Sequence, residues 1–470
     1  MNAREHSNDA AAPVGKAGGA PRPQEAGWLP DCVFTGDKFE AGLAFFADDL
    51  GRITRFSREA ADLAAARRLA GQAAIPGLVN THSQSWQRVL RGRIAPRGHG
   101  PPAPLAHALS GLSTADLYDA ARMAFMEMML SGITCVGEFH TLHRQPDGAP
   151  WPEPNLASHE LLRAARDTGL RLALFPAVAT RAGFRPPPPP GRGRLLTAKV
   201  DEYVRDVDAV RDFVARNHPG EAAWIGVAAH SLDTVPLDHL KAVATYAHAQ
   251  RLRLHLPLSA QPADNEACVA EYGRTPVTLL AEHGLLDKRF TAIHAIHLTD
   301  DEARLLGSAR ATVCACPAAT RLHGPGEVPA ARLHAAGAAL ALGTDNGTQI
   351  NLLAEARRLA RAEAGLAAAG LLFQAATAAG ARSMGAPSGA LEVGRPADFF
   401  TVALYDPSIA GAEPEALLDN IVFSLERRAI RDVWIGARQC VANGRHPYQG
   451  AIVSRFIELQ KRLWGGGAAA

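Results

Sequence analysis

The chain has 470 residues, and its 49 lysines and arginines nearly balance its 47 aspartates and glutamates, so the formal net charge is +2. This balance argues against a nucleic-acid-binding protein, which carries an excess of basic residues. Hydrophobic residues make up 47% of the chain and charged residues 20%, a mixture that favours a folded protein with a sizeable core over a disordered one.

The six cysteines are dispersed and indicate neither a disulfide framework nor a CxxC metal site. The first residues lack the basic start and apolar run of a secretory signal. No segment approaches the roughly 20 apolar residues of a membrane span. We therefore expect a soluble cytoplasmic protein without membrane or nucleic-acid partners, in which residues 1–27 form a disordered tail.

Short apolar or β-branched runs recur eight times through the middle of the chain, and helical patterns separate most of them. Repeated strand–helix units predict a parallel sheet, and eight units close into a (β/α)8 barrel of the TIM type, an α/β fold. The expected strands are Ile75–Val79, Ile133–Val136, Arg171–Pro176, Trp224–Ala229, Leu252–Leu258, Phe290–Ala295, Ala311–Ala315 and Ala339–Gly343. The expected helices include Ala115–Leu130, Leu156–Thr168, Val200–Asn217, Leu237–Gln250 and Leu352–Ala364.

The segments that flank the barrel read as short strands with turns, which predicts a small composite β-sandwich domain built from both termini. We expect this domain at residues 28–74 and 390–450, the barrel at 75–389, and a C-terminal helix and tail at 451–470. The proline run Pro186–Pro190 predicts a stiff surface loop.

Histidines and an aspartate stand at or near the expected strand ends. Because the C-terminal ends of barrel strands converge on one mouth, these side chains can meet around one small volume. They are His82, His140, His230, His255, His294 and Asp345. Imidazoles and a carboxylate suit Zn²⁺, which needs three protein ligands and an open position for water. The metal lowers the pKa of that water to about 7, so the set predicts hydrolysis of a polarised carbon.

At these residues the sequence resembles the amidohydrolase superfamily, and within it the formimidoylglutamate deiminases. The resemblance extends from about Val33 to Leu463 and implies a (β/α)8 barrel with a β-sandwich-like domain from both termini. The matching stretches are Pro76–Ser83 (PGLVNTHS), Gln87-Arg88, Glu138-Phe139-His140, Ala229–Leu232 (AHSL), His294–Thr299 (HAIHLT), Gly343-Thr344-Asp345 and Gly394–Asp398 (GRPAD).

The resemblance also implies roles for individual residues. The metal ligands would be His82 with its partner two residues on, His255 and Asp345. His294 would polarise the substrate or the attacking water, and His230 would contact the substrate. We therefore expect His294, Asp345 and His255 to be catalytic. His140 and Gln87 are further candidates for substrate contacts, as is Gln84, which occupies the second ligand position.

Four departures from the family pattern bear on function. The His-x-His motif reads His82-Ser83-Gln84, which replaces an imidazole ligand with a neutral amide. Leu258 stands where the deaminases have a glutamate, and it cannot act as a general acid. Past Asp345, the family's Ser-His reads Asn346-Gly347.

The fourth departure reverses a charge. Asp233 stands where the family has an arginine that holds the substrate carboxylate. Since Asp233 repels a glutamate-like dianion, formimidoylglutamate is not the expected substrate, and a small neutral or cationic molecule fits better.

Three interpretations follow from these residues. The first is a hydrolase that cleaves the C–N bond of an amidine, imine or amide, with Zn²⁺ held by His82, His255 and Asp345. The second is a metal-independent enzyme whose His/Asp cluster carries out elimination, isomerisation or cyclisation in a biosynthetic pathway. The third is a non-catalytic relative that binds a ligand. Apolar helices such as Leu366–Ala379 leave room for a homodimer face.

Overall fold

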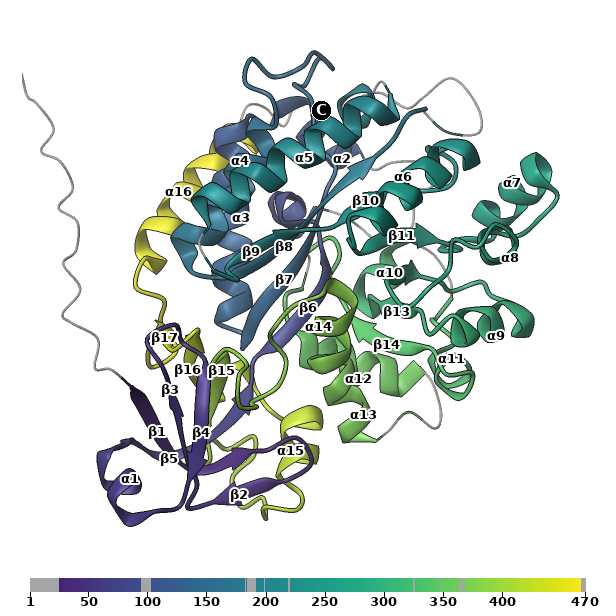
Figure 1. The fold of residues 1–470 in the computed structure, drawn as a ribbon. Coiled ribbons are helices and arrows are strands. Elements are labelled where there is room, and N and C mark those ends of the chain that lie inside the picture. The colour runs from purple at the N-terminus through teal and green to yellow at the C-terminus, as the bar shows by residue number, and fades with distance from the viewer. Residues whose placement is uncertain are drawn as a thin grey trace, which may run out of the picture.

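The computed structural model describes residues 25–465 apart from 94–102, 182, 184–191, 198, 219, 324–325, 348, 363–365 and 367. Most of the expected tail at residues 1–27 and the proline run Pro186–Pro190 lie outside the described residues. The described part is an α/β structure in which a nearly closed parallel barrel stands over a mixed sheet (Figure 1). The predicted fold class is therefore confirmed.

The barrel strands are parallel and follow the order β14-β13-β12-β11-β10-β8-β7-β6, and β9 pairs with β8. They are β6 (Leu78–Ser83), β7 (Ile133–His140), β8 (Arg171–Val178), β9 (Ala223–Ile225), β10 (Val227–Ala229), β11 (Leu254–Leu258), β12 (Phe290–His294), β13 (Thr312–Ala315) and β14 (Ala339–Leu342). Most of these strands are buried along their whole length, because helices cover their outer face and side chains fill the interior.

Helices surround the barrel in the order that the sequence pattern predicts (Figure 1). Capping boxes at Ser113/Asp116 and Thr299/Glu302 start α3 and α9, because each pair satisfies the first backbone N–H groups of its helix. The helices of the barrel are α2 (Ala103–Gly111), α3 (Thr114–Met129), α4 (Leu156–Thr168), α5 (Val200–Asn217), α6 (Leu237–Ala249), α7 (Pro262–Tyr272), α8 (Pro276–Glu282), α9 (Asp300–Ser308), α10 (Pro317–His323), α11 (Ala330–Ala335), α12 (Leu352–Ala362), α13 (Ala369–Ala375) and α14 (Ala378–Met384). None of the helices in the described ranges has the length and apolar character needed to cross a membrane.

Both ends of the chain contribute strands to the second sheet, which has the order β17-β16-β15-β5-β1-β3-β4 with β2 paired to β1. It lies below the barrel in Figure 1. Its strands are β1 (Ala26–Phe34), β2 (Phe39–Ala41), β3 (Ala44–Ala47), β4 (Ile53–Ser57), β5 (Arg67–Pro76), β15 (Phe399–Ala403), β16 (Ile430–Ile435) and β17 (Arg438–Val441). A short helix, α1 (Ala60–Ala65), joins β4 to β5, and α15 (Leu417–Phe423) lies between β15 and β16.

The apolar run expected as the first barrel strand belongs to two strands. Strand β5 of the second sheet includes Ile75 and ends at Pro76, whereas the barrel begins at Leu78. Gly77 alone separates the two strands, and a Cβ atom at Gly77 would lie 2.1 Å from Oγ1 of Thr134. The close approach of the two layers explains why a glycine occupies this position.

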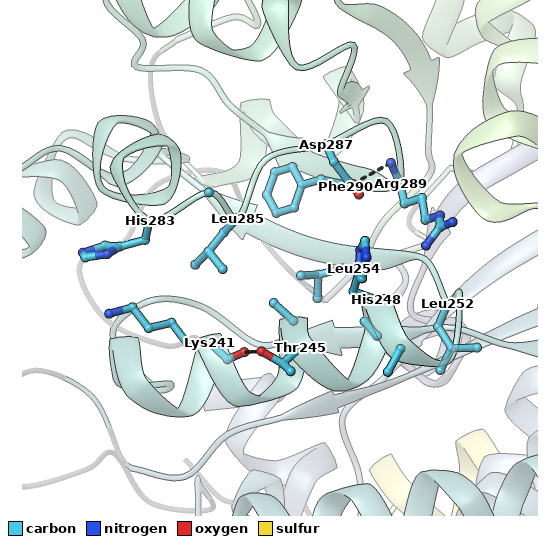
Figure 2. Close-up of a pocket in the computed structure, with 14 residues that line it drawn as sticks. Lys241, Thr245, His248, Leu252, Leu254, His283, Leu285, Asp287, Arg289 and Phe290 are labelled. Atoms are coloured by element: carbon cyan, nitrogen blue, oxygen red, sulfur yellow. Dashed lines mark hydrogen bonds between the residues drawn. The ribbon is translucent and has the colours of Figure 1, made fainter.

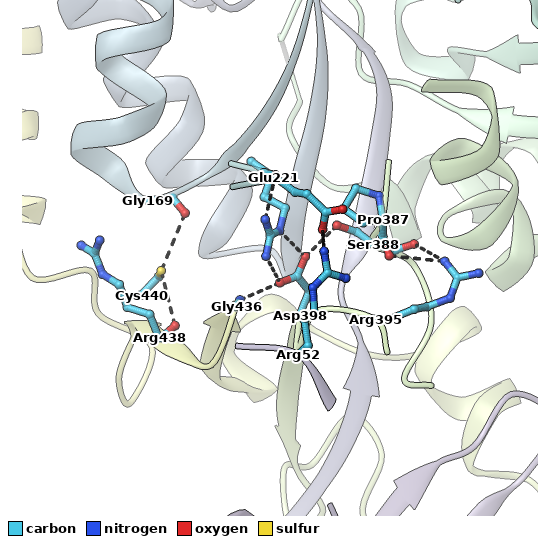
Figure 3. Close-up of polar contacts among 11 residues, drawn as sticks. Arg52, Gly169, Glu221, Pro387, Ser388, Arg395, Asp398, Gly436, Arg438 and Cys440 are labelled. Carbon is cyan, nitrogen blue, oxygen red and sulfur yellow. Dashed lines mark hydrogen bonds and ion pairs between the residues drawn. The ribbon is translucent and has the colours of Figure 1, made fainter. Parts of the chain in front are cut away.

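A buried ion pair joins the two sheets (Figure 3). On Arg171 of β8, Nε donates to Oδ2 of Asp398 at 2.6 Å and a terminal nitrogen donates to Oδ1 at 3.1 Å. The same carboxylate accepts from the hydroxyl of Ser388 and from the backbone N–H of Gly436. Asp398, part of the Gly394–Asp398 motif, thus ties the barrel to the mixed sheet with four hydrogen bonds.

The C-terminal helix, α16 (Gln449–Trp464), returns to the barrel and packs against α3 (Figure 1). Its apolar face buries Ile452, Phe456, Leu459 and Leu463. Arg455 and Arg462 form ion pairs with Asp119 and Asp116 of α3. Because α16 covers α3 with both apolar and charged contacts, it is an integral part of the barrel's outer layer.

The barrel closes between β6 and the segment that follows β14. The carbonyl of His82 accepts from the backbone N–H groups of Thr344 and Asp345 at 3.0 and 2.9 Å. The backbone N–H of Gln84 donates to the carbonyl of Asp345 at 2.8 Å. Below them, Asn80 and Thr344 exchange two hydrogen bonds at 2.8 and 3.0 Å. The first and last strands therefore meet through the residues that bear the candidate active site.

Candidate active site

Two of the predicted catalytic residues have left-handed backbone conformations. His294, the last residue of β12, has φ of 69°, and Asp345, after β14, has φ of 46°. This region is costly for residues other than glycine, and such strain is common at functional sites. The left-handed turns place both side chains at the same end of the barrel.

The side chains of His82, His294 and Asp345 converge. Nε2 of His82 lies 3.2 Å from Oδ1 of Asp345, and Nε2 of His294 lies 4.0 Å from Oδ2 of the same carboxylate. The ring centroids of the two histidines are 6.2 Å apart. Asp345 and His82 are almost fully buried, whereas the His294 side chain is 12% exposed. The structure thus brings these three residues together at a site that solvent reaches from the His294 side.

A chain of two amides reaches the same carboxylate. Nε2 of Gln84 donates to Oδ1 of Asp345 at 2.9 Å, and Nε2 of Gln87 donates to Oε1 of Gln84 at 2.9 Å. Next to them, Arg88 binds both carboxylate oxygens of Glu127 and the carbonyl of Gly347. The contacts of Arg88 hold the loop after Asp345, so its role in the structure is to position this loop.

His255 lies on β11 with its ring against Phe175, at a centroid distance of 3.8 Å and an interplanar angle of 17°. Burial lowers the pKa of His255 to about 3. Phe175 can take its position because Gly226 faces it, where a Cβ atom would lie 2.1 Å from the phenyl ring. Nε2 of His255 is buried, with no hydrogen-bond partner in the part of the chain that the structure describes.

The donor atoms do not fit a zinc ion. Gln84 presents N–H groups to Asp345 where the family has an imidazole, and an amide N–H has no lone pair to offer a metal. Oδ1 of Asp345 already faces both Gln84 and His82. Within the described ranges, no three His, Cys, Asp or Glu side chains come together as a group that could hold a metal ion. A catalytic zinc needs three such ligands.

The loop after β10 carries His230 and Asp233. Nδ1 of His230 lies 3.2 Å from the hydroxyl of Ser231, which also donates to the Asp233 carboxylate. The nearby Arg181 donates to the carbonyl of Asp233 and forms an ion pair with Glu271. Asp233 contributes to a raised pKa at Asp264, after burial of that carboxyl group. Asp233 on this loop and Asp264 on α7 (Pro262–Tyr272) therefore lie near each other.

His140, at the end of β7, is fully buried beside His143, with their ring centroids 4.8 Å apart. Burial lowers the pKa of His140 well below its usual value and that of His143 to about 4. Both imidazoles are therefore neutral at physiological pH. A substrate contact by His140 stays a prediction, as does one by Gln87.

The departure at strand five places an apolar side chain beside His294. Leu258 ends β11 and pairs in register with His294 of β12. Its side chain is buried, with a residue exposure of 4%. Neither a proton donor nor a metal ligand is available at this position.

Glu138 is a buried acid to which we assigned no role from the sequence. Its Oε1 accepts from the backbone N–H and the hydroxyl of Ser85, at 2.7 and 2.6 Å. Burial raises the pKa of Glu138 from 4.5 to about 8. A carboxylate in an otherwise apolar strand is the signal that could have singled it out. Through Ser85, it anchors the turn of helix η1 (Ser85–Leu90) that carries Gln87 and Arg88.

We expect Glu138 to make the protein less stable as the pH rises. Because its pKa in the folded protein lies above the unfolded value, the folded state binds more protons from about pH 4.5 to 8, and the free energy of unfolding falls across this interval. At 1.36 kcal/mol per pKa unit, the loss between pH 4.5 and about 8 amounts to about 5 kcal/mol. Glu138→Gln removes this dependence, which thermal unfolding at a series of pH values measures. Glu392→Gln, at an exposed site, is the control, and an unchanged pH slope in Glu138→Gln would contradict the prediction.

A cavity of about 550 Å³ lies away from these residues, on the outer side of β11 and β12 against α6 (Figure 2). Its lining includes Leu254, Leu285 and Phe290, with Lys241 and Arg289 among its charged residues. Leu254 packs in the outer core while its neighbour His255 stacks on Phe175. Successive residues of a strand point to opposite faces, so the wall of the barrel separates this cavity from the candidate active site.

Comparison with known proteins agrees with the fold and with the family resemblance. The chain is 29% identical over 420 residues to formimidoylglutamate deiminase of Pseudomonas aeruginosa, covering 85% of this chain and 91% of that protein. It is 27% identical over 404 residues to 5-methylthioadenosine/S-adenosylhomocysteine deaminase of Desulforudis audaxviator, covering 81% and 83%.

Solved structures share the architecture. An amidohydrolase from Brucella melitensis has a TM-score of 0.84 at 24% identity, covering 93% of this chain and 99% of that one. An adenosine deaminase from Xanthomonas campestris with bound zinc has a TM-score of 0.80 at 22% identity, covering 94% and 99%. The profile described as "Amidohydrolase family" matches residues 73–446, which include the barrel and most of the C-terminal strands. The chain belongs to the amidohydrolase family and is a hydrolase of C–N bonds other than peptide bonds.

Proposed function

We propose that the enzyme hydrolyses an amidine, imine or amide C–N bond in a small neutral or cationic substrate. The observation that carries this proposal is the convergence of His82 and His294 on the two oxygens of Asp345 at the mouth of the barrel. Family membership supports the reaction class, and Asp233, which stands where the resemblance implies an arginine, supports the charge of the substrate.

Asp345 is the general base in this proposal. The 4.0 Å between Nε2 of His294 and Oδ2 of Asp345 is too long for a direct hydrogen bond, but a water molecule can contact both atoms. The water oxygen attacks the polarised carbon as its proton passes to Asp345. His294, with its N–H, stabilises the charge that develops on the substrate.

Asp345 also handles the protons of the second step. In an amide, it passes the water proton to nitrogen, and the electron pair of the C–N bond leaves with the amine as the carbonyl re-forms. In an amidine or imine, that proton goes to nitrogen when water adds; Asp345 then takes the proton of the new C–OH group as the C=O bond forms and gives it to the departing ammonia or amine, which keeps the electron pair of the C–N bond. Leu258 cannot supply that proton, so the carboxylate acts first as base and then as acid. One water is consumed for each C–N bond that is broken. His82, against Oδ1 of Asp345, orients the carboxylate for both steps.

A panel of N-formimidoyl compounds tests the reaction and the charge preference together. The panel contains the formimidoyl derivatives of glutamate, of a neutral amino-acid amide and of a diamine, and ammonia release is measured. We expect the neutral or the cationic compound to have kcat/KM at least about tenfold above that of formimidoylglutamate, because Asp233 repels a dianion. Formimidoylglutamate as the best substrate would overturn the charge preference.

The variant Asp233→Arg tests whether the charge at position 233 causes this substrate preference. It restores a positive charge at this position, so we expect it to raise kcat/KM for formimidoylglutamate and to lower it for the cationic compound. Asp238→Asn, on the 93% exposed side chain of α6, is the matched control. Turnover in H₂¹⁸O shows whether water enters the product, and product without ¹⁸O would favour elimination or isomerisation over hydrolysis.

A further inference from the structure

The second ligand position of the family's His-x-His motif carries a hydrogen-bonded amide in this chain. Gln84 stands two residues after His82, and its Nε2 lies 2.9 Å from Oδ1 of Asp345. The two segments are also joined along the backbone, where Ser83 and Asp345 form a β-bridge and the N–H of Gln84 donates to the Asp345 carbonyl. These side-chain and backbone contacts together hold the amide of Gln84 next to the Asp345 carboxylate.

Gln87 determines which end of the Gln84 amide faces Asp345. Its Nε2 donates to Oε1 of Gln84 at 2.9 Å, which occupies the carbonyl end of that amide. The NH₂ end is thereby directed at the carboxylate. Gln84 and Asp345 are 261 residues apart in the chain, so a local turn does not explain the contact. The chain Gln87–Gln84–Asp345 is hereafter called the amide chain.

We propose that the amide chain positions Asp345 in place of a metal ion, so that this enzyme acts without bound zinc. The inference deepens the proposed function and rests on it for the role of Asp345. A hydrogen bond to an ionised carboxylate is charge-assisted and is stronger than one between neutral groups. Two amides in series therefore hold the catalytic oxygen atoms in a fixed orientation, a task that a bound cation performs through coordination.

The donor set supports this inference. An imidazole at position 84 would direct a nitrogen lone pair towards the region next to the Asp345 carboxylate, whereas the amide directs an N–H hydrogen there. Leu258 removes the acidic partner that a metal-bound water has in the deaminases that the sequence resembles. Nε2 of His255 is buried without a hydrogen-bond partner among the described residues, so it can accept a hydrogen bond from substrate or water as well as bind a metal. Gln84 is therefore the residue at which metal binding is lost or gained.

Zinc binding by the full chain and its variants tests the proposal without a substrate. We expect the wild type, produced with added zinc and dialysed, to contain far less than one zinc per chain and to show no rise in Tm with ZnSO₄. Gln84→His completes an imidazole pair beside His255 and Asp345, so it should hold about one zinc per chain and melt several degrees higher with zinc. Gln84→Met, of similar size, should gain neither.

Stoichiometric zinc in the wild type overturns the proposal, as does equal zinc uptake by Gln84→His and Gln84→Met. The wild-type zinc content decides the question even if Gln84→His fails to fold. These measurements need no substrate, so a panel without turnover counts against the proposed function alone.

Gln87 is tested as a positioning residue with the best substrate of the panel. Gln87→Met removes the donor to Gln84, and we expect kcat to fall about tenfold with KM within about twofold, because Asp345 is misplaced only for the chemical step. Gln87→Lys keeps a donor and should recover part of kcat. A chelator should leave wild-type turnover unchanged. Equal loss in both Gln87 variants, or inactivation by the chelator, overturns the proposal.

Discussion

Asp345→Asn is expected to lower kcat by about 10³-fold, the magnitude typical of removing a general base. The carboxamide has the shape of the carboxylate, so the barrel closure between β6 and the segment after β14 stays intact. Its Oδ1 still accepts from Gln84, but the amide cannot take a proton from water. The measurement is kcat on the best compound of the formimidoyl panel, with Tm as the check on folding.

Two further variants show whether the loss of activity in Asp345→Asn comes from the loss of the base. His294→Gln should lose less activity than Asp345→Asn, because glutamine retains an N–H that can polarise the substrate. Asp238→Asn is far from the site on an exposed helix position and should leave kcat unchanged. Retention of more than about a tenth of wild-type kcat by Asp345→Asn would be incompatible with its role as the base.

Asp398→Ala is expected to destabilise the protein by about 3–5 kcal/mol, the typical cost of breaking a buried ion pair from one side. The substitution leaves the guanidinium of Arg171 without its carboxylate, and the Arg171 side chain is only 10% exposed. It also leaves the Ser388 hydroxyl and the Gly436 N–H without an acceptor (Figure 3). Calorimetric Tm and chemical denaturation measure the loss.

An exposed pair a few residues away is the matched control for Asp398. Arg395 and Glu392 are bridged at 2.6 Å, with side chains 41% and 60% exposed. Because water screens this pair, Glu392→Gln should cost less than about 1 kcal/mol. Similar losses in the two variants would show that burial of Arg171 and Asp398 does not set the strength of the contact.

The fold was predictable from the sequence because its signals are local and periodic. The helix Leu156–Thr168 and the helix Val200–Asn217 lie within the expected bounds, since amphipathic spacing and flanking loop residues define both. The first strand differed because Gly77 separates two strands within a run that has no polar residue. An apolar pattern alone does not show that Ile75 pairs with one sheet and Leu78 with another.

The candidate site was predictable in part, for a related reason. His82, His294 and Asp345 follow strands whose C-terminal ends must converge, so their meeting follows from the strand count. No comparable rule of barrel geometry predicts that Gln87 forms a hydrogen bond with Gln84. A substrate contact by Gln87 stays a prediction, and only the tertiary structure shows that its amide donates to Gln84.

By itself, the sequence determined the barrel, the family resemblance and the identity of the polar side chains at the strand ends, because these depend on periodicity and residue type. It also showed that Gln84 replaces an imidazole and that Asp233 reverses a charge. Only the tertiary structure decided what Gln84 contacts in place of a metal ion. The hydrogen bond from Gln84 to Asp345 joins groups 261 residues apart, and its direction depends on the orientation that Gln87 imposes on the amide. Hydrogen-bond direction is a property of three-dimensional placement, which no residue pattern along the chain specifies.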